Sequence, residues 1–233
     1  MVFPYPDLFE ALAHFAAFFD TRNDKQFRCF FLSAYDMIPD RDPQKHILYE
    51  AIQTYPLNDL RSPVILLEWV FKIVGYFHYQ TTNVKFMSFD RFREKYKSEN
   101  ITIDSWSHPV WRILHEYAAG YDRTQTYALS YKSMVSCLVA LLPCARCRNH
   151  LKDNLADHPI DNFFGSREDL FTWSYILHQK VSSQLKKKGI SFDEAKKIYL
   201  WQKWIFTYYK SCIYKPCPRV RKYVFQPNIS TSI

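Results

Sequence analysis

The chain has 233 residues, of which 48% are hydrophobic and 18% aromatic, and its formal net charge is +8. This length suits one large domain or two small ones, and the composition excludes disordered and low-complexity classes. The chain has four glycines and no GxGxxG or GxxxxGK[ST] string, which argues against a phosphate-binding loop.

Apolar residues recur at helical spacing along most of the chain, and strand alternation is almost absent. The sequence predicts helices over residues 7–19, 63–79, 108–121, 126–142, 166–189 and 191–212. Asp7 is the expected N-cap of the first, and Pro109 is expected in the first turn of the third. The helix at 166–189 is expected to close on lysines and a glycine. We therefore predict an all-α chain.

The apolar stretch at 63–79 contains Glu68, Lys72 and His78, so we interpret it as a buried helix rather than a membrane span. The first ten residues lack a basic region followed by an uninterrupted apolar core, so we expect no signal peptide. Both observations predict a soluble, intracellular protein.

The two halves of the sequence match each other at an offset of 102 to 104 residues. The matched ranges are 8–20 with 110–122, 37–48 with 141–152, 62–73 with 166–177, and 88–96 with 191–199. Four matches in the same order favour an internal duplication over a chance resemblance between two amphipathic bundles. We therefore predict two tandem helical domains, over residues 1–100 and 101–212, that pack as an intramolecular pseudo-dimer, followed by a basic tail at 213–233.

A CxxC pair, Cys144 and Cys147, stands in the second half, where the first half has Asp40-Arg41-Asp42-Pro43. Zinc would need four ligands, and the sequence offers no second CxxC, only His150 and His158 nearby. Pro143 should end one helix so that the pair opens the next. The helix N-terminus, with Arg146 or Arg148, would then stabilise a thiolate. This favours a redox-active disulfide, which needs an electron acceptor. Zinc and inert buried thiols remain as alternatives.

Three separated motifs within residues 104–205 resemble the Erv/ALR flavin-dependent sulfhydryl oxidases. The first is Trp111, His115, Ala118 and Tyr121 in the pattern W-xxx-H-xx-A-xx-Y, and the second is the CxxC. The third is Trp173, His178, Val181 and Leu185. Trp106, five residues before Trp111, resembles the opening of the motif in viral members of the family.

The resemblance implies an enzyme that binds FAD, oxidises protein dithiols and passes the electrons to O₂, giving H₂O₂. It makes Cys144 the outer, interchange sulfur and places Cys147 against the flavin. It implies no metal. The implied FAD contacts are Trp106, Trp111, His115, Tyr121, Trp173, His178, Gln179, Val181, Ser182, Leu185, Lys188 and Tyr199.

The sequence departs from the family pattern at three positions. Gln179 and Ser182 replace two asparagines, so the hydrogen-bonding groups there differ in reach and type. Phe192 stands about where the family often has the first cysteine of a structural disulfide. The sequence therefore keeps the CxxC of the family pattern but changes two of the implied flavin contacts and the position of that disulfide.

A degenerate first copy fused to an active second one resembles the sulfhydryl oxidases of baculoviruses and other large insect-infecting DNA viruses. The implied partners are thiol-containing proteins, with a homodimer left open, and the implied location is the host nucleus or cytoplasm and the virion. Two other functions remain as alternatives. One is a catalytically dead helical scaffold, and the other is nucleic-acid binding by the basic, aromatic residues 208–225.

The four remaining cysteines lie outside the CxxC. Cys29 and Cys137 fall in apolar helical patterns, which predicts small buried side chains. Cys212 and Cys217 bracket a short segment near the basic tail. They are candidates for a shuttle disulfide, a local structural disulfide or free thiols.

Overall fold

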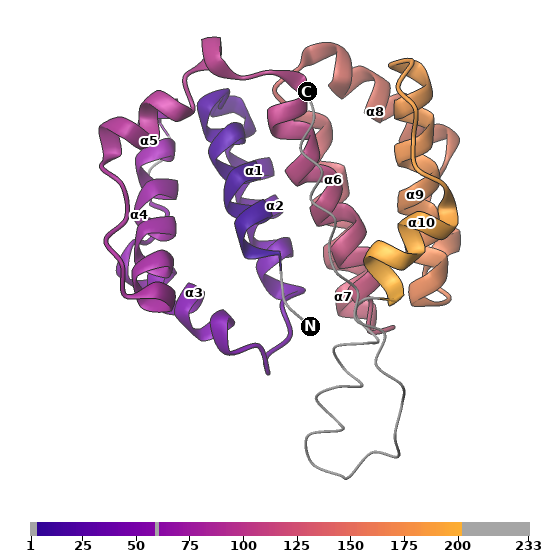
Figure 1. Cartoon of the computed structure of the whole chain (residues 1–233), viewed down its shortest axis with the longest axis horizontal. Coiled ribbons are helices and arrows are strands. Elements are labelled where there is room, and N and C mark those ends of the chain that lie inside the picture. The colour runs from indigo at the N-terminus through magenta and orange to yellow at the C-terminus, as the bar shows by residue number, and fades with distance from the viewer. Residues whose placement is uncertain (1–3, 59–60, 202–233) are drawn as a thin grey trace, which may run out of the picture.

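The computed structural model describes residues 4–58 and 61–201, and within these residues it is helical and has no strand (Figure 1). The prediction of an all-α chain is therefore confirmed at this level. Cys212, Cys217, the basic tail and the last part of the helix predicted at 191–212 lie outside the described residues.

The described part of the chain forms ten α-helices, which fall into two groups that lie side by side (Figure 1). The first group is α1 (Tyr5–Ala17), α2 (Asp24–Asp36), α3 (Pro43–Thr54), α4 (Pro63–Thr82) and α5 (Phe89–Lys95). The second is α6 (Ile103–Gly120), α7 (Gln125–Leu141), α8 (Ala145–Asp157), α9 (Arg167–Gln184) and α10 (Phe192–Lys196). Short turns of 3₁₀ helix, η1 (Thr21–Asn23), η2 (Ser98–Asn100) and η3 (Ile160–Phe163), and a π-helical turn, η4 (Lys197–Trp201), connect or extend them.

The two groups pack through α1 against α6 and, most extensively, α2 against α7. Within the first group α4 packs on α1 and α3, and within the second α9 packs on α6 and α8. Buried hydrophobic side chains from both groups form one continuous core. The Tyr117 hydroxyl donates a buried hydrogen bond of 2.8 Å to the Ala34 carbonyl across this boundary. A buried hydrogen bond of this kind stabilises the packing of the two groups of helices.

Helix α6 begins five residues before the predicted start, because Thr102 and Ser105 form a capping box there. The prediction that Pro109 lies in the first turn is therefore wrong, and Pro109 lies inside the helix. Proline has no N–H to donate to the carbonyl four residues earlier, which belongs to Ser105. Buried His14 of α1 lies near this backbone, and the Ser105 backbone influences its pKa.

Three other helix ends differ from the sequence expectation. Helix α1 begins at Tyr5, so Asp7 lies in the first turn and is not the N-cap, which is Pro4. Helix α9 ends at Gln184 rather than on Gly189. Lys186 has a φ of 55°, and the Lys186 and Lys187 N–H groups donate to the Ser183 and Ser182 carbonyls. This Schellman geometry ends α9 early without a glycine. Helix α10 continues beyond Lys196 as a π-helical turn.

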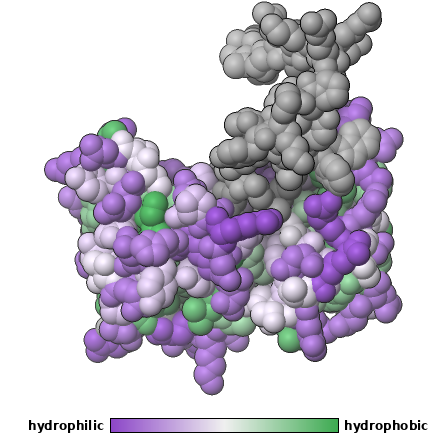
Figure 2. All heavy atoms as spheres, turned by 90° about the horizontal axis from the view of Figure 1, so that it is seen from below, coloured by the Kyte–Doolittle hydropathy of each residue, from purple (hydrophilic) through white to green (hydrophobic). Residues whose placement is uncertain are grey.

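Helix α4, at 20 residues, includes the stretch interpreted as a buried helix, and only part of it is buried. Along the part of the chain that the structure describes, no helix combines the length and apolarity needed to cross a bilayer. The face seen in Figure 2 is mostly hydrophilic, with hydrophobic residues in separate spots on the coloured surface.

Candidate functional site

The CxxC lies at the junction between α7 and α8. Cys144 is the N-cap of α8, and its Sγ accepts a hydrogen bond of 3.2 Å from the Cys147 N–H. The two cysteines form a disulfide. The predictions that Pro143 separates two helices and that the pair opens the second are confirmed. A sulfur at this position faces the partial positive charge of the helix N-terminus, which lowers the pKa of a thiol.

Arg148 holds the segment before the disulfide in place. Its Nη1 donates at 2.6 Å to the carbonyl of Leu142, the C-cap of α7. The guanidinium therefore lies near the cysteines and also fixes the loop that carries them. Removing it would leave a carbonyl without its charged donor.

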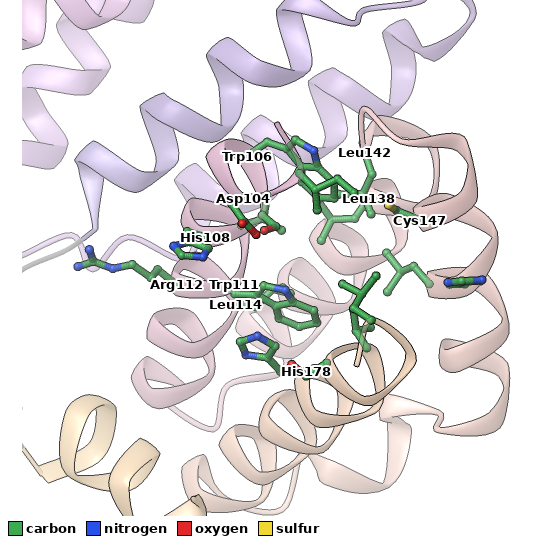
Figure 3. A pocket seen from close by; sticks show the side chains of 18 of the residues that line it. Asp104, Trp106, His108, Trp111, Arg112, Leu114, Leu138, Leu142, Cys147 and His178 are labelled. Atoms are coloured by element: carbon green, nitrogen blue, oxygen red, sulfur yellow. The ribbon is translucent and has the colours of Figure 1, made fainter. Parts of the chain in front are cut away.

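A cavity of about 350 Å³ lies beside the disulfide, among α6, α7, α8 and α9 (Figure 3). This volume is typical of a small-molecule site. Cys147 lines it, together with apolar side chains such as Leu138 and Leu142, whereas Cys144 is not among the lining residues. The residues that line it all lie between positions 103 and 199. One sulfur of the pair therefore faces the cavity.

Two stacked rings form a flat part of the cavity wall. Trp111 of α6 and His178 of α9 have ring centroids 4.1 Å apart and an angle of 7° between their planes (Figure 3). Behind them, His178 Nδ1 lies 3.0 Å from His115 Nε2, and His115 Nδ1 lies 2.9 Å from Ser174 Oγ. Flat aromatic walls with fixed polar groups suit a planar ring ligand.

The hydrogen bonds fix which nitrogen of each imidazole carries the proton. The Ser174 hydroxyl donates to the Phe171 carbonyl at 2.8 Å, so it accepts from His115 Nδ1–H. His115 Nε2 is then an acceptor, and His178 Nδ1–H is the donor to it. This leaves His178 Nε2 as an acceptor. Burial lowers the pKa of His115 to about 3 and that of His178 to about 4, so both rings are neutral near pH 7.

Charged side chains line the cavity at the start of α6 and just after α9. Lys187 Nζ forms a salt bridge with Asp104, and both residues line the cavity. Arg112 also lines it and pairs with Asp7 of α1 at 3.4 Å. Ile103 and Leu185, both lining residues, are 44% and 41% exposed, so this part is open to solvent. The cavity thus combines an apolar, ring-walled part with a cationic part.

The predicted FAD contacts divide into two sets in the structure. Trp106, Trp111, His178, Val181, Ser182, Leu185 and Tyr199 line the cavity, as does Cys147. His115, Tyr121, Trp173, Gln179 and Lys188 do not.

Each residue of the second set has another place. His115 supports His178 from behind. Trp173 is fully buried and its Nε1 donates to the His158 carbonyl. Tyr121 donates to the Phe164 carbonyl, and Gln179 donates to the Ile190 carbonyl. Lys188 is exposed.

The cavity is also lined by polar and charged residues that the sequence did not indicate, namely Asp104, His108, Arg112 and Lys187. The first three share a face of α6 with Trp111 at helical spacing. His108 and Arg112 lie within the helix predicted at 108–121, whereas Asp104 lies before it and required the earlier start of α6. Lys187 rather than Lys188 reaches the cavity because α9 ends at Gln184.

Cys29 and Cys137 lie on the packed pair α2 and α7. Cys137 is buried, as predicted, and Cys29 is half-buried. Burial and the neighbouring Cys29 raise the pKa of Cys137 to about 12, so it is a poor nucleophile. Within residues 4–58 and 61–201, no group of three or more His, Cys, Asp or Glu side chains is arranged to hold a metal ion.

Comparison with known proteins finds that residues 108–204 match the family model described as the Erv1 / Alr family. The chain is 33% identical over 96 residues to a FAD-linked sulfhydryl oxidase of African swine fever virus, covering 40% of this chain and 79% of that protein. It is 30% identical over 95 residues to a probable FAD-linked sulfhydryl oxidase of Acanthamoeba polyphaga mimivirus, covering 40% and 66%. A FAD-linked sulfhydryl oxidase of Arabidopsis thaliana is 28% identical over 89 residues, covering 37% and 46%. No solved structure matches the chain significantly.

Proposed function

The chain belongs to the Erv1/Alr family, and from this membership we propose that it is a FAD-linked sulfhydryl oxidase whose Cys144–Cys147 disulfide oxidises protein dithiols. One observation carries the assignment of the site. Cys147 lines a ring-walled cavity, and its disulfide partner Cys144 caps α8 outside the lining. This arrangement suits a pair that accepts electrons from a substrate on one side and transfers them to a cofactor on the other.

The exchange begins at Cys144, the sulfur outside the cavity lining. A substrate thiolate attacks Cys144 Sγ, the Cys144–Cys147 bond breaks, and Cys147 leaves as a thiolate. A second substrate thiolate then attacks the substrate sulfur of the mixed disulfide and releases the Cys144 thiolate. The substrate dithiol has lost two electrons and two protons, and the enzyme pair has gained the two electrons. The Cys147 N–H lies 3.2 Å from Cys144 Sγ and stabilises the Cys144 thiolate, so it favours release of Cys144 from the mixed disulfide.

The cavity residues fit FAD by their chemistry. The stacked Trp111 and His178 rings offer a flat wall for a planar ring, and His178 Nε2 offers an acceptor for an N–H or O–H group. Lys187 and Arg112, which pair with Asp104 and Asp7, supply cationic groups for a pyrophosphate. When bound, FAD takes the two electrons from the dithiol and passes them to O₂, giving H₂O₂. The protein's own contribution is to orient that group and to hold Cys147 beside it.

The first half, residues 1–100, acts in this proposal as a degenerate copy of the second half, residues 101–212, and covers it as a second subunit would. Three local parallels support the duplication. Ser62 and Ser166 cap α4 and α9, 104 positions apart. The matched tryptophans also make matching hydrogen bonds. Trp69 Nε1 donates to the Tyr55 carbonyl, and Trp173 Nε1 donates to the His158 carbonyl.

The third parallel concerns the segment before α3 and α8. Lys45 Nζ donates to the Ile38 carbonyl at 2.7 Å, and Arg148 Nη1 donates to the Leu142 carbonyl at 2.6 Å. In each half a cation early in the third helix fixes the end of the second. The apolar packing of α2 on α7 and α1 on α6 is what a pseudo-dimer needs.

Two measurements test the proposed function. The purified full-length chain should be yellow, with one FAD per chain rather than two, and should consume O₂ when dithiothreitol is added. A colourless protein without thiol-dependent O₂ uptake would instead favour a dead scaffold. A stoichiometry of two would mean that the first half also binds flavin.

A truncation tests the pseudo-dimer. Residues 104–233 alone should aggregate or self-associate into a dimer, because the faces of α6 and α7 that the first half covers become exposed. Sedimentation and size-exclusion measurements distinguish these states. A truncated chain that stays monomeric, stable and fully active would overturn the architecture. The same measurements on the full chain decide whether it forms a homodimer.

A further inference from the structure

We propose that the first half takes part in substrate recognition: the turn at Asp20–Asn23, with Arg22, forms part of a basic docking surface beside Cys144 that selects cysteines flanked by acidic residues. The proposal rests on the proposed function, because it concerns the protein substrate of the same disulfide. It assigns a role to residues of a half that carries no CxxC.

One hydrogen bond joins this turn to the segment that leads to the disulfide. Asn23 Nδ2 donates to the Ala140 carbonyl at 3.2 Å, four residues before Cys144. The charge of Arg148, one residue after Cys147, also acts on Asp20, and Arg148 Nη1 donates to the Leu142 carbonyl. The turn therefore lies beside the segment that carries the CxxC. A substrate chain long enough to extend from Cys144 toward the first half would meet it.

The turn is built so that Arg22 is held in place while its charge faces solvent. Asp20 caps the turn by accepting from the Arg22 N–H at 2.9 Å and from Arg22 Nε at 3.0 Å. These hydrogen bonds lower the pKa of Asp20 to about 2, so the pair stays ionised. The Arg22 side chain is nevertheless 87% exposed. A restrained, exposed guanidinium binds a carboxylate with less loss of side-chain entropy than a free one.

The charge around the disulfide selects the kind of partner. Residues 20–28 and 144–152 together contain six Lys or Arg and two Asp. Asp20 pairs with Arg22 and Asp24 with Arg28, so the two segments together carry a net charge of +4. Lys25 and Arg146 are exposed. This positive charge attracts acidic side chains next to the substrate cysteine and repels basic ones. It therefore affects the rate of substrate association and the specificity more than the rate of thiol–disulfide exchange.

The experiment uses the full flavin-loaded chain and three dithiol substrates. Two are peptides with one CxxC flanked by glutamates or by lysines, and the third is dithiothreitol. O₂ uptake gives kcat/KM for each. The wild-type chain should prefer the acidic peptide to the basic one, and the preference should shrink at high salt, because exposed charges are screened.

Arg22→Glu should lower the ratio of kcat/KM for the acidic peptide to that for dithiothreitol about tenfold, and Arg22→Gln about threefold. Asn23→Ala should lower the same ratio, because it frees the turn from α7. Arg93→Glu is the matched control: Arg93 is also an exposed arginine beside an aspartate, Asp90, but lies on α5. That variant should leave the ratio unchanged.

The outcomes separate the two proposals. A chain that oxidises all three substrates with a ratio insensitive to Arg22→Glu, or equally sensitive to Arg93→Glu, overturns the docking surface and leaves the oxidase intact. A flavin-loaded wild-type chain that oxidises none of the three overturns the proposed function and the docking surface with it.

Discussion

The two halves of the molecule share a helix order and several anchoring contacts, yet the cavity lies in the second. The reason can be found at three matched positions. Ser107, Trp111 and Val181 line the cavity. The matched ranges pair Trp111 with Phe9, and extending them at the same offsets pairs Ser107 with Tyr5 and Val181 with Phe77. Two of the three side chains are larger there, which reduces the space between the helices.

The three rings of the first half form an aromatic cluster. The centroids of Tyr5 and Phe77 are 4.8 Å apart, and those of Phe9 and Phe77 are 5.0 Å apart. The Tyr5 hydroxyl also donates to Asp42, which is the N-cap of α3 as Cys144 is of α8, although the sequence match pairs Cys144 with Asp40. Aromatic rings thus fill the space between these helices of the first half, whereas the second half keeps a cavity beside its disulfide.

The largest effect is expected from the reactive residues. Cys144→Ser and Cys147→Ser should each reduce dithiol oxidation to the background rate, because neither sulfur can complete the exchange alone. Asp40→Ser, at the matched position of the first half, should leave activity unchanged. Steady-state O₂ uptake with dithiothreitol measures all three. An effect of Asp40→Ser comparable with that of Cys144→Ser would contradict the assignment of chemistry to the second half.

The same cysteine variants distinguish the two sulfurs by absorbance. Cys144→Ser should show a thiolate-to-flavin charge-transfer band without added reductant, because Cys147 is then an unpaired thiol lining the cavity. Cys147→Ser should lack the band even when reduced. If the bands appear in the opposite variant, the roles of the two cysteines are exchanged.

A reciprocal exchange at the matched pair Val181 and Phe77 should give the next largest effect. Val181→Phe should weaken flavin binding about tenfold or more, since overfilling a packed site costs about 1–3 kcal/mol. Phe77→Val should instead lower the free energy of unfolding by about 2 kcal/mol through the cavity it leaves in the aromatic cluster.

Flavin content after dialysis and urea unfolding measure the two effects of this exchange. Phe77→Val is expected to retain its flavin, which makes it the control for Val181→Phe. Equal flavin loss in both variants would mean that the aromatic cluster of the first half has no separate, purely structural role.

The sequence predicted the helical class and the position of the CxxC, because hydrophobic periodicity and Pro143 are local signals. It did not predict the division of the FAD candidates between the cavity and its surroundings. Trp173 and Gln179 lie on the same helix as His178, and only the packing of α9 on α6 and α8 decides which face meets the cavity. Likewise the early end of α9 depends on Lys186 adopting a positive φ, which no residue type there requires.

The smallest effect concerns the buried imidazole pair of the second half, whose matched positions in the first half are Ala13 and Val74. Burial lowers the pKa of His115 to about 3 and that of His178 to about 4, from 6.5. Between about pH 6.5 and 4 the unfolded chain therefore binds more protons than the folded one. Stability is complete above this window and decreases as the pH falls through it.

The His115→Asn variant tests this linkage, because it removes one titrating ring while keeping a group that can donate to Ser174. Each such histidine contributes at most about 1.4 kcal/mol per pH unit, so between pH 6 and 5 the wild type should lose about 1 kcal/mol more than the variant. Burial also lowers the pKa values of His14 and His158, so the variant should keep part of the dependence. Urea unfolding at both pH values gives the two slopes. Identical slopes would show that the His115 ring is not held neutral by the second half, and its hydrogen bonds to Ser174 and His178 would then need a different protonation state.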